Sequence, residues 1–141
     1  MMGRYRHVFV AMLVITVLGC SHRSGENQER SPFASGMVCT DELRAGITVE
    51  VRDALTGTPA ACGASGEARD GTYIAPLTDE GRCTEAPMTW AYLTGAWERA
   101  GVYTVAIRKP GYRDWVQEQV VVTADACHVQ PVSLQANLES E

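Results

Sequence analysis

Three observations predict an all-β fold for this 141-residue chain, in the form of a seven-stranded antiparallel sandwich. Apolar and polar residues alternate with a period of two in several short segments from Ile47 onward. Residues that favour turns, mainly Gly, Pro, Asp and Thr, separate these segments. No helical period extends over a useful length. Short alternating strands between regularly spaced turns are typical of β-sandwiches.

The first half of this region is expected to form four strands. Ile47, Val49 and Val51 alternate with polar residues, which is typical of a strand with one buried face. The Asp70-Gly71 pair favours a hairpin, because glycine adopts positive φ at little cost. The expected strands are residues 47–52, 60–69, 72–77 and 89–95, with a turn over 53–59 and a loop carrying Cys83 over 78–87.

The second half is expected to form three strands. Tyr103, Val105 and Ile107 share one face of the first of them. In the next strand, three consecutive valines at 120–122 interrupt the alternation, so we expect a β-bulge near Trp115. The expected strands are residues 102–108, 112–123 and 127–138, separated by turns at 109–111 and 124–126.

The N-terminal residues are typical of a bacterial lipoprotein signal peptide. A basic start precedes an apolar run over residues 8–18, which is shorter than the roughly 20 residues that a membrane-spanning helix needs. The run ends in Val17-Leu18-Gly19-Cys20, which resembles the lipobox of such signals. The resemblance implies that residues 1–19 are removed and that Cys20 is lipidated. The acyl chains, palmitate among them, would hold the protein to a membrane. An ordinary secretory signal that is cut elsewhere is the alternative.

A flexible tether is expected between the lipid anchor and the folded domain. Residues 21–36 are polar and show no apolar period, so they cannot bury a core. The expected organisation is a signal peptide over 1–19, the lipidated cysteine and tether over 20–36, and the sandwich over 37–141. Ser21 stands where an Asp would favour retention in the inner membrane of a Gram-negative cell. We therefore expect the outer membrane, with the domain facing the periplasm or the cell surface.

The charge of the mature chain argues against some partners. Residues 1–19 hold two of the 12 Lys and Arg residues and none of the 17 acidic ones, which leaves a net charge of 10 − 17 = −7. Proteins that bind nucleic acid neutralise phosphates with Lys and Arg, so this chain is not expected to bind DNA or RNA. We expect the charge to keep the domain soluble.

Three motifs, taken in order, resemble the carboxypeptidase regulatory-like domain. They are VRDALTGTP over residues 51–59, DGTY over 70–73 and GVYTVAIRKPGY over 101–112. The resemblance covers roughly residues 45–136, although the loop around Cys83 and the segment 90–97 depart from the family. It implies a Greek-key sandwich of the prealbumin (transthyretin) type, and Tyr103 and Tyr112 offer large rings to the space between two sheets. It implies no single activity, because such domains serve as appendages, adaptors and surface modules.

The four cysteines after Cys20 are expected to form two disulfides. An even set in an exported domain of about 100 residues is typical of disulfides, whereas a zinc site would favour close pairs such as CxxC. If every connection reverses the chain, Cys62 and Cys83 lie at one end of the sandwich, and Cys39 and Cys127 lie at the other. Cysteines at opposite ends are too distant to be bridged. We therefore predict the pairs Cys62–Cys83 and Cys39–Cys127, with the first strand parallel to the last.

No catalytic constellation is found in the sequence, and we predict that the protein is not an enzyme. His128 is the only histidine of the domain, and Ser-His-Asp chemistry needs a base within reach of a nucleophile. A lone histidine beside a disulfide is more often structural. Several acidic residues lie in expected turns: Asp53, Asp70, Asp79, Glu80 and Asp125. They lack the spacing of a calcium loop, so turn-forming hydrogen bonds explain them better. No metal or cofactor is expected.

Three tryptophans are the candidate ligand-binding residues. Trp97, Trp90 and Trp115 would present a stacking surface to a sugar or a protein if they were exposed, and core packing is the competing interpretation. Trp97 lies in an expected turn and is the best placed for exposure. A planar row of accessible aromatics would favour a sugar, and an apolar patch would favour a protein. We therefore predict a lipid-anchored, non-enzymatic binding or structural module at the cell envelope. A carbohydrate- or peptidoglycan-binding module is the alternative.

Overall fold

The computed structural model describes residues 38–84, 87 and 89–141. The predicted signal peptide, Cys20 and tether lie outside the described residues. The strands are β1 (Ile47–Asp53), β2 (Ser65–Asp70), β3 (Tyr73–Leu77), β4 (Tyr92–Gly95), β5 (Gly101–Arg108), β6 (Trp115–Ala124), β7 (Val129–Gln130) and β8 (Val132–Leu138), with one 3₁₀ turn at Arg82–Thr84. The all-β prediction is confirmed, although the described residues form eight strands where seven were expected. None of the described segments is a helix long and apolar enough to span a bilayer.

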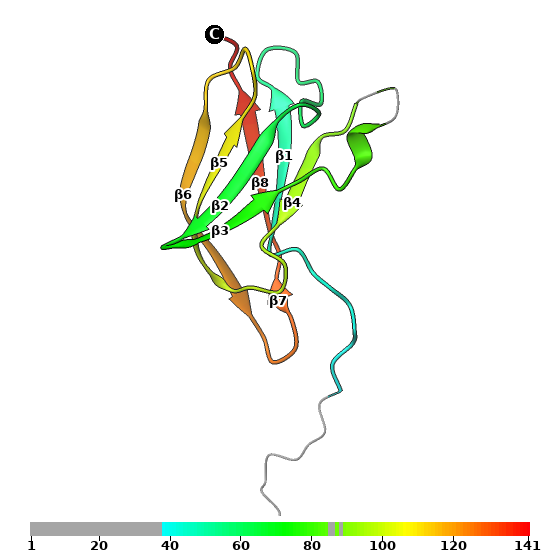
Figure 1. Ribbon diagram of the computed structural model, residues 1–141, viewed down its shortest axis with the longest axis vertical. Coiled ribbons are helices and arrows are strands. Elements are labelled where there is room, and N and C mark those ends of the chain that lie inside the picture. Colours follow the sequence, from blue (N-terminus) through cyan, green and yellow to red (C-terminus); the bar gives the residue numbers. More distant parts are fainter. Residues whose placement is uncertain (1–37, 85–86, 88) are drawn as a thin grey trace, which may run out of the picture. The chain divides into compact units, whose positions relative to one another are not determined.

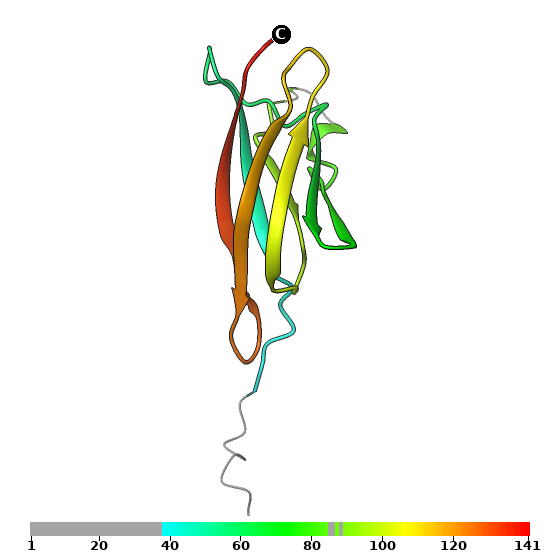
Figure 2. The ribbon, with the colours of Figure 1, turned by 90° about the vertical axis from the view of Figure 1, so that its left-hand side faces the viewer.

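The eight strands lie in two sheets that face each other (Figures 1 and 2). The three-stranded sheet has the order β4-β1-β8, and the five-stranded sheet has the order β3-β2-β5-β6-β7. β1 is antiparallel to β4 and parallel to β8, in register from Ile47↔Val132 to Asp53↔Leu138. The predicted parallel arrangement of the first and last strands is therefore confirmed.

The core lies between the sheets and follows the alternation in the sequence. The side chains with no exposed area include Ile47, Val49 and Val51 on β1, and Tyr103, Val105 and Ile107 on β5. Each buried aliphatic side chain stabilises the fold by roughly 1.5–3 kcal/mol. Tyr112 is partly buried against this core, and its hydroxyl donates a hydrogen bond to Asp53 Oδ2 at 2.9 Å. Both predicted tyrosines thus contribute to the packing between the sheets.

Two predicted strands have different limits in the structure. β2 begins at Ser65 rather than at residue 60, because Ala60 donates its backbone N–H to Val51 of β1 instead. The predicted last strand, 127–138, divides at Pro131. β7 pairs with β6 in the five-stranded sheet, whereas β8 pairs with β1 in the other sheet. Proline has no N–H for a ladder, so the chain changes sheet at this residue.

The predicted bulge in β6 is present, but it lies at Glu118-Gln119 rather than near Trp115. The pairing of β5 with β6 shifts there, so that these two residues lie opposite Thr104 alone. Gln119 adopts a positive φ of 57°, which is uncommon outside glycine and typical of such irregular positions. The alternation resumes after the bulge, and Val121 faces outward between two buried valines.

Two disulfide bonds close the two ends of the sandwich, as the cysteine count predicts. Cys39 is joined to Cys127 with a Cα–Cα distance of 5.3 Å, and Cys62 is joined to Cys83 with a distance of 5.4 Å. This is the pairing expected from strand parity. The first bond fastens the segment before β1 to the β6–β7 turn. The second bond fastens the β1–β2 connection to the 3₁₀ turn after β3.

Candidate functional site

The three tryptophans do not share one surface. The ladder between β1 and β4 runs from the pair Ile47 and Gly95 to the backbone hydrogen bond that Val51 donates to Ala91. Trp97 and Trp90 therefore lie beyond opposite ends of this ladder. Trp97 is 45% exposed, as expected for its turn.

Trp90 and Trp115 are both partly buried against the core. The ring of Trp90 meets that of Tyr92 edge-on, with centroids 5.6 Å apart, and the guanidinium of Arg82 lies 5.2 Å from its centroid. Trp115 pairs with Ile107 at the start of β6. A planar row of exposed tryptophans is therefore not formed by these three residues.

Exposed apolar side chains gather instead on the outward face of the five-stranded sheet. Val102 of β5 and Val121 of β6 are directly opposite in register and are 46% and 53% exposed. Val116 of β6 and Ile74 of β3 point to the same side, because side chains alternate along a strand. These four residues are called the valine face below. Sequence reasoning missed them, although the alternation after the bulge marks Val121 as outward.

Several charged side chains beside Val116 form ion pairs with one another. Glu67 lies 3.6 Å from the guanidinium of Arg69 and 3.7 Å from that of Arg108. Arg108 also donates its Nε–H to Asp114 at 3.0 Å. Two cations and two anions are therefore paired beside the valine face.

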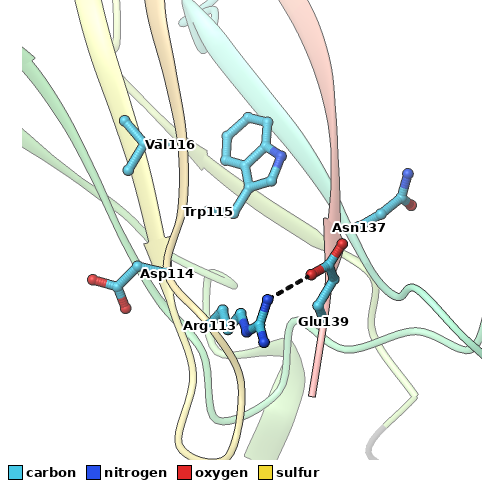
Figure 3. Close-up of a pocket in the computed structure, with 6 residues that line it drawn as sticks. All are labelled: Arg113, Asp114, Trp115, Val116, Asn137 and Glu139. Atoms are coloured by element: carbon cyan, nitrogen blue, oxygen red, sulfur yellow. Dashed lines mark hydrogen bonds and ion pairs between the residues drawn. The ribbon is translucent and has the colours of Figure 1, made fainter. Parts of the chain in front are cut away.

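A pocket of about 300 Å³ lies where the starting segment of β6 meets the end of β8 (Figure 3). It is lined by Arg113, Asp114, Trp115, Val116, Asn137 and Glu139. Figure 3 shows the indole of Trp115 in the space between the two strands, with the ion pair of Arg113 and Glu139 beside it at 3.4 Å. Sequence reasoning singled out Trp115 but not its charged neighbours.

The acidic turn residues mainly organise their own turns. Asp53 Oδ1 accepts the backbone N–H groups of Leu55 and Thr56, and Asp125 Oδ1 accepts those of Cys127 and His128. The N–H of Thr56 is the main cause that holds the pKa of Asp53 below its ordinary value. The N–H of His128 does the same for the pKa of Asp125. Within the described ranges, no group of three His, Cys, Asp or Glu side chains is arranged to hold a metal ion.

His128 takes part in a group of structural hydrogen bonds beside the Cys39–Cys127 bond. Its Nδ1 lies 3.1 Å from Glu98 Oε1, and its Nε2 lies 3.0 Å from the hydroxyl of Thr40. The backbone N–H of Arg44 also donates to Glu98, at 2.6 Å, and is the main cause that lowers the pKa of this carboxyl. Both ring nitrogens of His128 thus contact structural partners.

Comparisons with known proteins give little further guidance. No protein-family model matches the chain, and no curated protein matches it. Among solved structures, the chain is similar to one in the crystal structure of a type II cohesin–X–dockerin complex from Acetivibrio cellulolyticus, a C-terminal interface mutant. The two chains are 18% identical with a TM-score of 0.38, and the match covers 64% of this chain. It spans about half, 51%, of that chain.

Proposed function

We propose that the protein is a lipid-anchored, non-enzymatic binding module of the cell envelope whose valine face contacts a protein partner. The observation that carries the proposal is the exposed pair Val102 and Val121, side by side on adjacent strands of a sheet face that no other described element covers. Exposed apolar side chains that adjoin one another are typical of interaction sites, whereas single exposed apolar residues are ordinary.

The chemistry of this face favours a protein over a sugar. A sugar-binding platform would use a row of aromatic rings, and the three tryptophans lie apart on different elements. β-Branched side chains on a sheet give a flat apolar surface, and the ion pairs around Glu67 give it a polar rim.

A binding role also agrees with the chemistry that the described residues lack. The domain has one histidine, and both ring nitrogens of His128 are engaged by Thr40 and Glu98. General-base catalysis needs a base that can reach a nucleophile. The four cysteines of the domain are joined in disulfides and supply no thiolate.

The anchor in this proposal is a lipid on Cys20, with the outer membrane as the destination. The support is the short apolar leader that ends in Val17-Leu18-Gly19-Cys20. In a Gram-negative host, radiolabelled palmitate should enter the wild-type protein and should not enter the variant Cys20→Ser. Equal labelling of the two, or no labelling of either, would refute the lipoprotein assignment.

The partner site is tested by photo-crosslinking in intact cells. A photoreactive residue at Val121 should give a discrete crosslinked band with an envelope protein. The matched control is Gln135, which is exposed on the outward face of the other sheet. The substitution Val121→Lys should weaken binding of the recovered partner by about tenfold or more without unfolding the domain, since this side chain is half exposed. Equal crosslinking from both positions, or none from Val121, would overturn the proposed interface.

A further inference from the structure

The pocket beside Trp115 lies in a fork between two strands of different sheets. Just before β6 begins and just after β8 ends, Tyr112 and Ser140 form an isolated antiparallel bridge, and Arg113 donates its backbone N–H to Glu139 at 2.9 Å. If that bridge continued, Trp115 would pair with Asn137. β6 and β8 separate there instead, and the indole ring occupies the opening (Figure 3).

The two strands that bound the fork each have an open edge. β6 pairs with β5 on one side, and it pairs with β7 on the other side only at Thr123 and Ala124. β8 pairs with β1 alone. Over the described part of the chain, no backbone hydrogen bond joins β6 to β8 after Arg113 in the sequence. Outward-pointing N–H and C=O groups of both strands are therefore available at the pocket, because each strand of a sheet bonds on both of its edges.

The side chains around the pocket combine a flat ring with charged and polar groups. Trp115 is partly buried, so its ring is held in place by the core while its pocket side remains open. Arg113 and Glu139 are 70% and 67% exposed, so neither is committed to a buried ion pair. Asn137 adds one amide, which both donates and accepts. Asp114 completes the lining, and its carboxylate accepts a hydrogen bond from Arg108. The pocket thus offers both donors and acceptors of hydrogen bonds.

From this arrangement we propose that the fork is a binding site for one sugar ring of a neutral saccharide. A pyranose presents a C–H face that buries apolar area against an indole, and hydroxyl groups that both donate and accept hydrogen bonds. The volume of about 300 Å³ lies at the low end of small-molecule sites, roughly 300–1,000 Å³, which suits one ring. The site shares Val116 with the valine face, but Trp115, Arg113 and Glu139 are not part of that face. Failure of the saccharide site would therefore leave the proposed interface at Val102 and Val121 untouched.

Other ligand classes fit the fork less well. An anion would be repelled by Asp114 and Glu139, which outnumber Arg113 in the lining. A cation would meet carboxylates that already pair with Arg108 and Arg113. An extended peptide could add to an open strand edge, but the bulge at Glu118-Gln119 distorts the edge of β6 and removes the straight run that strand addition requires. A neutral polyol is the class that uses the ring, the charged pair and both backbone edges together.

The test follows the indole N–H signals of the full-length chain by NMR in a detergent without a sugar headgroup. Cellotetraose and the tetramer of N-acetylglucosamine serve as probes at millimolar concentration. We expect a saturable shift of the Trp115 signal with at least one of them and no shift of the Trp97 signal. The double variant Arg113→Gln/Glu139→Gln should bind about tenfold more weakly or worse, since hydrogen bonds from charged groups are lost at two exposed positions.

Two further variants separate binding from folding. Trp97→Leu removes an exposed indole at the other end of the sandwich and should leave saccharide affinity unchanged. Trp115→Phe keeps a ring against the core and should weaken binding while the other amide signals stay in place. No saturable shift with either saccharide would overturn the proposal. So would a saccharide affinity that the double variant leaves unchanged.

Discussion

The Cys39–Cys127 disulfide is expected to stabilise the domain more than Cys62–Cys83 does. The two bonds close sequence separations of 88 and 21 residues. The shorter loop is nested in the longer one, so the outer loop effectively spans 88 − 21 = 67 residues when the inner bond is intact. The loop-entropy relation then gives about 4.4 kcal/mol for the outer bond and about 3.3 kcal/mol for the inner bond. Domains of this size are stable by only about 5–15 kcal/mol, so either loss is large.

The comparison uses two double variants, Cys39→Ser/Cys127→Ser and Cys62→Ser/Cys83→Ser, which leave no unpaired partner to form wrong bonds. Urea unfolding gives the free energy of unfolding of each, and coincident transitions by tryptophan fluorescence and circular dichroism check two-state behaviour. The first variant should lose about 1 kcal/mol more than the second. A larger loss in Cys62→Ser/Cys83→Ser, or a loss near zero in either variant, would refute the entropic reasoning.

Three further predictions follow from the packing and charges of the domain. Gly95→Ala should lower the free energy of unfolding by roughly 1–3 kcal/mol in urea titrations, because the added Cβ would lie 2.4 Å from the carbonyl oxygen of Pro76. Tyr103→Phe should lower the free energy of unfolding by about 1 kcal/mol and lower the melting temperature in a thermal scan. The reason is that the buried hydroxyl donates a hydrogen bond to the carbonyl of Arg99 and accepts one from its guanidinium. The pKa values of Asp53 and Asp125 are lower in the folded state than their ordinary value of 3.8. As the pH falls through that value, the unfolded chain therefore binds more protons than the folded domain does. Stability should therefore be full above about pH 5 and decrease below pH 4, and Asp125→Asn should flatten the curve of unfolding free energy against pH.

The strands with a clear period of two could be predicted from the sequence because one face of each is fully buried. Ile47, Val49 and Val51 on β1 are an example, and parity along the chain was sufficient to pair the cysteines. The limit at Ser65 depends on which strand the preceding residues join, and no local propensity carries that information. Pro131 is a local signal for the break between β7 and β8, because proline cannot donate to a ladder.

The candidate surfaces were less accessible to prediction than the fold. Val121 faces outward only because the bulge at Glu118-Gln119 resets the alternation, and the bulge was expected several residues earlier. The pocket brings Trp115 to Glu139 and Asn137, more than 20 residues away in the sequence, at a contact between edges of two sheets. Composition and spacing do not report on such a contact.

The position of the Cys39–Cys127 bond determines how the domain would carry mechanical tension. A force applied between the backbone before Cys39 and Glu141 is transmitted covalently through the Cys39–Cys127 disulfide and then along residues 127–141. The strands from β1 to β6 lie outside that load path. Only 141 − 127 = 14 residues can then extend, by roughly 50 Å in all, whereas the reduced chain would release roughly 280 Å with Cys62–Cys83 intact. The oxidised domain can thus lengthen only a little under tension, because most of its chain lies inside the loop that the bond closes.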